Sequence, residues 1–315
     1  MNRNAFRPGV GVLGAGRWGT TLAQLAARQG SPVVLWSEDG EVDPTAELPA
    51  ERVRTTRELL DVANNCELVL LAVPAARLRG LCRSLGDVLD GAHLLVHAVR
   101  GLDPHSGALP QRVMAEETAV LRTGALLGAA LVDELRAGRP NAAVIASRFQ
   151  EVQQATADAL HGPVLHLKPE RDQVGVEMAA AAASALALAL GIADGLGFGP
   201  AARAGLVANA AAELASAVVA AGGEAHSAYG FAGLGFLLVE READSRDMQA
   251  GRLLARGKTI SEIKATLGNI DGADAAAVVA KLCKAKGVET PILRGLADVL
   301  AGQVDLATAV ASYIR

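Results

Sequence analysis

Short apolar runs alternate with helical patterns through the first half of the chain. Six runs rich in valine, leucine or alanine have the length of buried strands, and they cover residues 9–13, 32–36, 68–73, 93–97, 125–128 and 142–146. Segments with apolar residues at helical spacing lie between them, such as 20–29 and 76–85. Because this alternation is typical of a parallel sheet with helices on both faces, the pattern predicts a right-handed, doubly wound α/β domain.

The pattern changes after about residue 168, where the strand-like runs stop. Long helical segments rich in alanine and leucine follow, and glycines interrupt them at 195–199 and 222–223. The uncharged stretch 178–192 is shorter than the roughly 20 residues that span a bilayer, so it predicts a buried helix and no membrane span. The sequence therefore predicts an α/β domain at 1–169 and an all-α domain at 170–315.

Length and charge agree with this division and exclude one class of partner. A chain of 315 residues exceeds what one compact core usually holds. The net charge is −4 and no cluster of lysine and arginine is visible, which argues against nucleic acid as a partner. The three cysteines form no C-x-x-C pair, no histidine or cysteine spacing suggests a metal site, and the N-terminus lacks the apolar core of a signal peptide. These features together predict a cytoplasmic protein without a metal.

A glycine-rich element directly follows the first apolar run. It reads Gly14-Ala-Gly16-Arg17-Trp18-Gly19 and opens the helical segment from Thr20. In this context Gly14 permits a tight turn, Gly16 lets the backbone approach a pyrophosphate, and Gly19 permits close packing of helix on strand. The element predicts a Rossmann-like domain that binds a dinucleotide at a helix N-terminus, and the alternative is a purely structural glycine turn.

Three further residues are expected beside the dinucleotide. Ser37 and Glu38 follow the second apolar run, at about the usual distance of a ribose-reading residue. A carboxylate at Glu38 would bind the ribose 2'-hydroxyl and repel a 2'-phosphate, which favours NAD(H) over NADP(H) without excluding the latter. The alternative is a solvated loop charge. Pro74, after the third run, is expected to line one side of the cofactor site. The alternative is that this proline simply ends the strand.

Several longer strings resemble the glycerol-3-phosphate dehydrogenase family over nearly the whole chain. The matching strings are those at 14–20, 34–36, 100–103, 191–199, 231–235, 245–246 and 287–292. The most specific are G-I-A-D-G-L-G-F-G at 191–199 and G-V-E-T-P-I at 287–292. The resemblance implies a dinucleotide-binding N-terminal domain, a helical substrate domain, and reduction of dihydroxyacetone phosphate to glycerol 3-phosphate.

The chain departs from the family at polar positions to which the resemblance assigns chemistry. The family's catalytic lysine corresponds to Ala183, and a second lysine corresponds to Arg100. Its aspartate corresponds to Phe236, its threonine to Glu240, and the asparagine of S-R-N to Asp247. The glycine framework is intact, whereas the expected catalytic positions are degenerate.

This contrast supports two hypotheses about function. The first is an inactive or repurposed family member that binds NAD(H), with an unknown protein partner. The second is a working dehydrogenase, acting on dihydroxyacetone phosphate or on another substrate with displaced catalytic groups. Arg246 is expected among the cofactor-binding residues, and both it and Arg203 are either anion contacts or ordinary surface arginines. The sequence does not decide whether the protein forms a homodimer.

Overall fold

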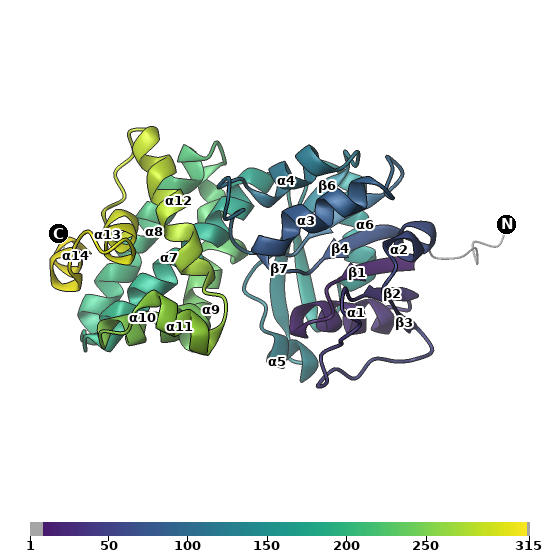
Figure 1. Cartoon of the computed structure of the whole chain (residues 1–315), viewed down its shortest axis with the longest axis horizontal. Helices are drawn as coiled ribbons and strands as arrows, with labels where there is room; N and C mark the ends of the chain where they lie inside the picture. The colour runs from purple at the N-terminus through teal and green to yellow at the C-terminus, as the bar shows by residue number, and fades with distance from the viewer. Residues whose placement is uncertain (1–8, 314–315) are drawn as a thin grey trace. The chain divides into compact units, whose positions relative to one another are not determined.

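The computed structural model describes residues 9–313, which divide into two compact units (Figure 1). The first unit comprises 9–99 and 110–173, and the second comprises 100–109 and 174–313. The segment 100–109 thus belongs with the helical unit, although the residues on both sides of it belong with the sheet.

An eight-stranded sheet forms the first unit. Its strands are β1 (Gly9–Leu13), β2 (Val33–Trp36), β3 (Val53–Thr56), β4 (Cys66–Leu71), β5 (Leu94–His97), β6 (Thr123–Leu127), β7 (Asn141–Ala146) and β8 (Leu165–Glu170). Their order is β3-β2-β1-β4-β5-β6-β7-β8, and every neighbouring pair is parallel except β6 and β7. The predicted fold class, a doubly wound sheet followed by a helical region, is confirmed.

The sheet contains two strands that the sequence pattern does not predict. Both are edge strands, β3 and β8. Only Val53 is buried in β3, and β8 alternates the buried Leu165 and Leu167 with exposed His166 and Lys168. A half-exposed edge strand has no continuous apolar run, which explains why it was missed.

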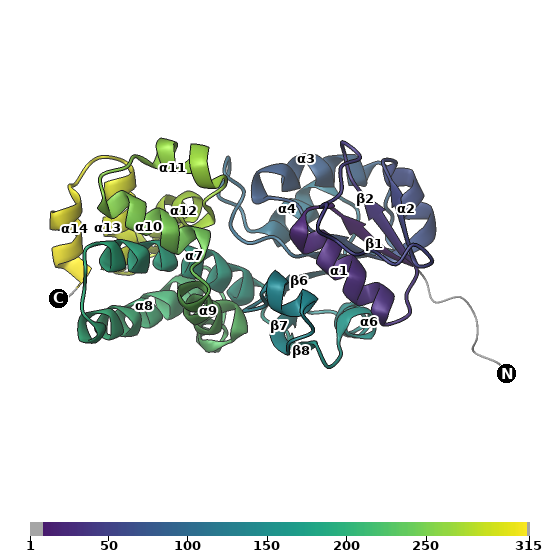
Figure 2. The same cartoon turned by 90° about the horizontal axis from the view of Figure 1, so that it is seen from below.

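Helices cover both faces of the sheet. Helices α1 (Arg17–Arg28) and α6 (Gln150–Leu160) lie together on one face. Helices α2 (Leu59–Asn65), α3 (Ala75–Gly86) and α4 (Pro110–Glu117) lie on the other, as Figure 2 shows for α3 and α4 opposite α1. The short helix α5 (Val132–Arg136) packs on α1. The strand side chains that point to one face of the sheet, such as Val10 and Val12, form a continuous core with α1 and α6.

The second unit is helical. Its elements are α7 (Gln173–Gly195), α8 (Pro200–Ala220), the 3-10 turn η1 (Ala225–Tyr229), the π-helical turn η2 (Phe231–Gly235), α9 (Phe236–Glu242), α10 (Arg246–Ala255), α11 (Ile260–Leu267), α12 (Asp271–Ala285), α13 (Pro291–Leu300) and α14 (Leu306–Tyr313).

Helix α7 is the core of the second unit. Both α7 and α8 are long and apolar enough to cross a membrane, but the apolar stretch of α7 is entirely buried in this structure, which confirms the predicted buried helix. A third of the corresponding stretch of α8 is buried. Glycines let α10 approach α7, since a Cβ on Gly251 would lie 2.3 Å from the carbonyl oxygen of Leu188.

Candidate functional site

The glycine loop between β1 and α1 has the geometry of an anion-binding turn. Gly14 has φ +111°, and a Cβ there would lie 2.5 Å from the carbonyl oxygen of Ala72. A Cβ on Gly19 would lie 1.8 Å from the carbonyl oxygen of Gly14. A Cβ on Gly16, in contrast, meets nothing within 4 Å. The protein itself thus requires glycine at positions 14 and 19, whereas a side chain at position 16 would project into open space beside the loop.

Helix α1 begins directly after this open position. Gly16 is its N-cap residue and offers no side chain to the first-turn N–H groups. The first turn carries no acidic residue, so the positive end of the helix dipole is not neutralised from within the helix. Arg17 is exposed and forms an ion pair with Asp133, and Trp18 is half-buried against the core below α1. The loop fits the pyrophosphate of a dinucleotide.

The loop lies where the strand order reverses. Strand β1 pairs with β2 on one side and with β4 on the other, which is the position where open α/β sheets bind ligands. After β2, the buried hydroxyl of Ser37 lies 2.6 Å from the carbonyl oxygen of Glu41. Glu38 is exposed, and its carboxylate pairs with Arg77 at 3.1 Å. Pro74 precedes α3 as its N-cap residue.

A second group of charged residues lies within the helical unit. The guanidinium of Arg100 is 4.9 Å from the ring centroid of Phe236, and its Nη1 is 3.3 Å from Oε1 of Glu240. Glu240 is buried, whereas the side chain of Arg100 is partly exposed. The arginine is therefore held by a cation–π contact and by an ion pair.

Two further carboxyl groups surround this arginine. Asp247 is buried and accepts a hydrogen bond of 2.9 Å from the backbone N–H of Gly272. Burial raises the pKa of Asp247 well above its usual range, and the charges of Asp271 and Glu240 add to this effect. Burial likewise raises the pKa of Asp271, although Arg100 opposes the change. Glu240, paired with Arg100, compensates part of its charge and so lowers the positive potential available to a phosphate.

The other predicted positions differ in how they relate to this cluster. Ala183 has no solvent exposure and belongs to the apolar core of the helical unit. Arg203 is paired with Asp194, which also binds Arg252. Arg246 is exposed at the start of α10, and its charge opposes the rise in the pKa of Asp271, so it belongs to the electrostatics of the cluster. Arg203 is thus part of an ion-pair network between helices.

Two residues of the site carry no signal in the sequence. Asp271 begins α12 without any motif, and its proximity to Arg100 depends on the tertiary fold. Arg136, which contacts the first turn of α1, lies in a short helical segment that contains no functional motif. Long-range contacts of this kind cannot be found from local patterns.

The fold and the glycine loop define a dinucleotide-binding protein of the α/β class with a helical second unit. Family models for the N-terminus and the C-terminus of NAD-dependent glycerol-3-phosphate dehydrogenase match residues 9–153 and 172–311. A relative from Ralstonia nicotianae, named glycerol-3-phosphate dehydrogenase (NAD(P)+), is 37% identical and covers 92% of each chain. One from Aromatoleum aromaticum with the same name is 35% identical over 92% of this chain and 93% of its own. The chain belongs to the NAD-dependent glycerol-3-phosphate dehydrogenase family.

Solved structures agree with this assignment. The crystal structure of glycerol-3-phosphate dehydrogenase from Coxiella burnetii superposes with a TM-score of 0.91 at 26% identity, covering 98% of this chain and 99% of its own. The yeast enzyme, at 20% identity and a TM-score of 0.85 over 98% of this chain and 100% of its own, shares the fold. The predicted family is therefore confirmed.

Proposed function

We propose that this protein binds NAD(H) through the glycine loop and is catalytically impaired as a glycerol-3-phosphate dehydrogenase. The observation that supports impaired catalysis is the set of contacts made by the Arg100 side chain. Where the resemblance places a lysine near an aspartate and a threonine, Arg100 lies over Phe236 and is paired with the buried Glu240. A guanidinium so engaged is poorly available to a phosphorylated substrate.

The loss of proton chemistry supports the same proposal. Reduction of a ketone places negative charge on its oxygen, which a positioned ammonium stabilises and protonates. The resemblance assigns this role to a lysine at the position of Ala183, which is buried in apolar surroundings. Glu240 also adds a carboxylate beside Arg100, which opposes binding of a dianionic substrate there.

One observation favours a second function, a dehydrogenase of altered substrate. Burial raises the pKa of Asp247, which favours its protonated form, and the charge of Arg100 acts on the same group. A substrate without phosphate could then take its proton from Asp247. Replacement by Asn would abolish turnover in that case.

The cysteines agree with a cytoplasmic location, which we include in the proposal. Cys66, Cys82 and Cys283 are free and buried. Burial raises the pKa of Cys66 and of Cys82 to about 12, so both thiols stay protonated and unreactive. Such thiols suit a reducing compartment.

Calorimetric titration with NADH, NADPH and dihydroxyacetone phosphate, with absorbance followed in the same samples, separates binding from turnover. The unmutated protein should bind NADH, and Gly16→Val should abolish binding because its side chain enters the space left for the phosphates. Gly80→Val on α3 is the matched control, since a Cβ there also meets nothing within 4 Å. Undetectable binding of both dinucleotides at millimolar concentration would refute the proposal.

A further inference from the structure

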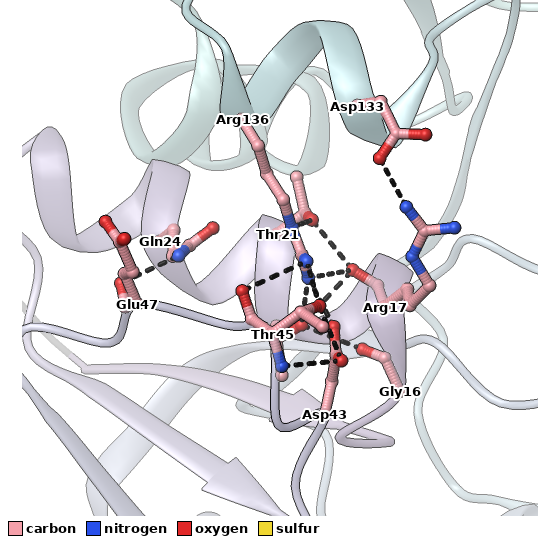
Figure 3. Close-up of polar contacts among 10 residues, drawn as sticks. Gly16, Arg17, Thr21, Gln24, Asp43, Thr45, Glu47, Asp133 and Arg136 are labelled. Atoms are coloured by element: carbon pink, nitrogen blue, oxygen red, sulfur yellow. Dashed lines mark hydrogen bonds and ion pairs between the residues drawn. The ribbon is translucent and has the colours of Figure 1, made fainter.

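Arg136, the last residue of α5, donates hydrogen bonds to the first turn of α1 (Figure 3). Its Nη2 lies 3.1 Å from the carbonyl oxygen of Arg17 and 2.9 Å from Oγ1 of Thr20. Its Nε lies 3.0 Å from Oγ1 of Thr21. One side chain, far along the chain, therefore contacts three residues in the first two turns of the helix.

The same guanidinium also binds the loop that follows β2. Its Nη2 lies 2.6 Å from Oδ2 of Asp43, and its Nη1 lies 2.8 Å from Oγ1 of Thr45. The hydrogen bond from Arg136 lowers the pKa of Asp43 to about 2, so the pair is ionised at neutral pH. Both side chains are largely buried, at 16% and 6% exposure. Each guanidinium nitrogen is committed to a partner, and the charge is balanced by Asp43.

These contacts engage three successive carbonyl groups of the glycine loop. The backbone N–H of Asp43 donates to the carbonyl oxygen of Ala15 at 2.9 Å. The hydroxyl of Thr20 donates to that of Gly16 at 3.0 Å, and Arg136 donates directly to that of Arg17. With the carbonyl groups held in this way, the first-turn N–H groups are the polar groups left for an anion.

We propose that Arg136 is a positioning residue that holds the glycine loop in its pyrophosphate-binding conformation. The inference rests on the proposed binding of NAD(H) and assigns to α5 a part in it. Arg136 acts through the geometry of its donors, because Asp43 already neutralises its charge. A lysine, which presents a compact ammonium in place of a planar fork, cannot reproduce these contacts.

The test compares NADH with adenosine, which lacks the pyrophosphate. Dissociation constants for both are measured by calorimetry on the full chain, for the unmutated protein and for Arg136→Ala and Arg136→Lys. Arg52→Ala is the matched control, because this exposed arginine of the same unit binds the carbonyl oxygen of Gly30, at the other end of α1. Thr20→Val, which removes the hydroxyl and keeps the shape, serves as a second variant that should fold if the Arg136 variants do not.

Both Arg136 variants should weaken NADH binding by about tenfold or more and leave the affinity for adenosine unchanged. Thr20→Val should weaken NADH binding by a smaller factor in the same selective way. An NADH affinity within about twofold of the unmutated value, or a parallel loss of NADH and adenosine binding, would overturn the inference. Failure of the unmutated protein to bind NADH would instead refute the proposed function itself.

Discussion

Glu213 of α8 should make the stability of the helical unit depend on pH. Its two carboxylate oxygens accept hydrogen bonds from the backbone N–H groups of Ile292, at 2.6 Å, and Leu293, at 3.0 Å, in the first turn of α13. These bonds favour the charged form, but the cost of burial is larger and raises the pKa of Glu213 to about 7. The neutral carboxyl group is therefore favoured by folding.

The sign and size of the effect follow from this difference. A carboxyl group whose pKa is higher in the folded state contributes stability below its unfolded pKa, and this contribution is lost as pH rises through the folded pKa. The rise from 4.5 to about 7 corresponds to about 3 kcal/mol. The free energy of unfolding should thus fall by about 3 kcal/mol through this group between pH 4.5 and pH 8.

Urea unfolding at a series of pH values compares the unmutated protein with Glu213→Gln, which removes the titrating group and leaves the other groups in place. Both tryptophans, Trp18 and Trp36, lie in the first unit, so circular dichroism is the better probe of the helical unit. The stability of the unmutated protein relative to the variant should decline as pH rises. Glu242→Gln, which removes an exposed carboxylate of the same unit, should show no such trend. A pH-independent difference for Glu213→Gln would refute the reasoning.

Three further predictions concern ligands. NADH should bind about tenfold more tightly than NADPH, and Glu38→Arg should narrow or invert this preference. Equal affinities in the unmutated protein would show that Glu38 is a solvated loop charge that does not contact the ribose. Asp133→Asn should strengthen NADH binding about two- to fivefold at low salt, by freeing Arg17 beside the loop, and a titration without any such gain would contradict this. Oxidation of NADH by dihydroxyacetone phosphate should be at least about 10³-fold slower than in ordinary enzymes. The Ala183→Lys variant alone should not restore this activity, because Phe236 offers no carboxylate to orient the new ammonium group. Turnover near about 10 per second in the unmutated protein would show that another group supplies the proton.

The parts of this protein that the sequence predicts are those with local signals. Buried strands such as β4 and β5 form continuous apolar runs, and the glycine loop has a fixed spacing that its turn geometry requires. Edge strands have half their side chains in solvent and lose that signal. Burial of a long apolar helix such as α7 follows from its composition alone.

Contacts between distant residues had no such signal. Arg136 and Asp43 are 93 positions apart, and Arg100 and Glu240 are 140 apart. Substitutions at Ala183 and Phe236 could be noticed only because a family resemblance supplied an expectation for those positions. How Arg100 is held depends on packing that no short motif encodes.

The excursion of residues 100–109 into the helical unit limits how this protein can be divided or recombined. The backbone passes from one unit to the other at 99–100, 109–110 and 173–174, so neither unit is one uninterrupted stretch. A cut at 173 would separate Arg100 from Glu240, and a gene fusion that exchanged only the C-terminal half would import one partner of this ion pair without the other. The helical unit therefore cannot be transferred as one continuous segment of the gene. A substitution at position 100 affects residues encoded far downstream, such as Glu240.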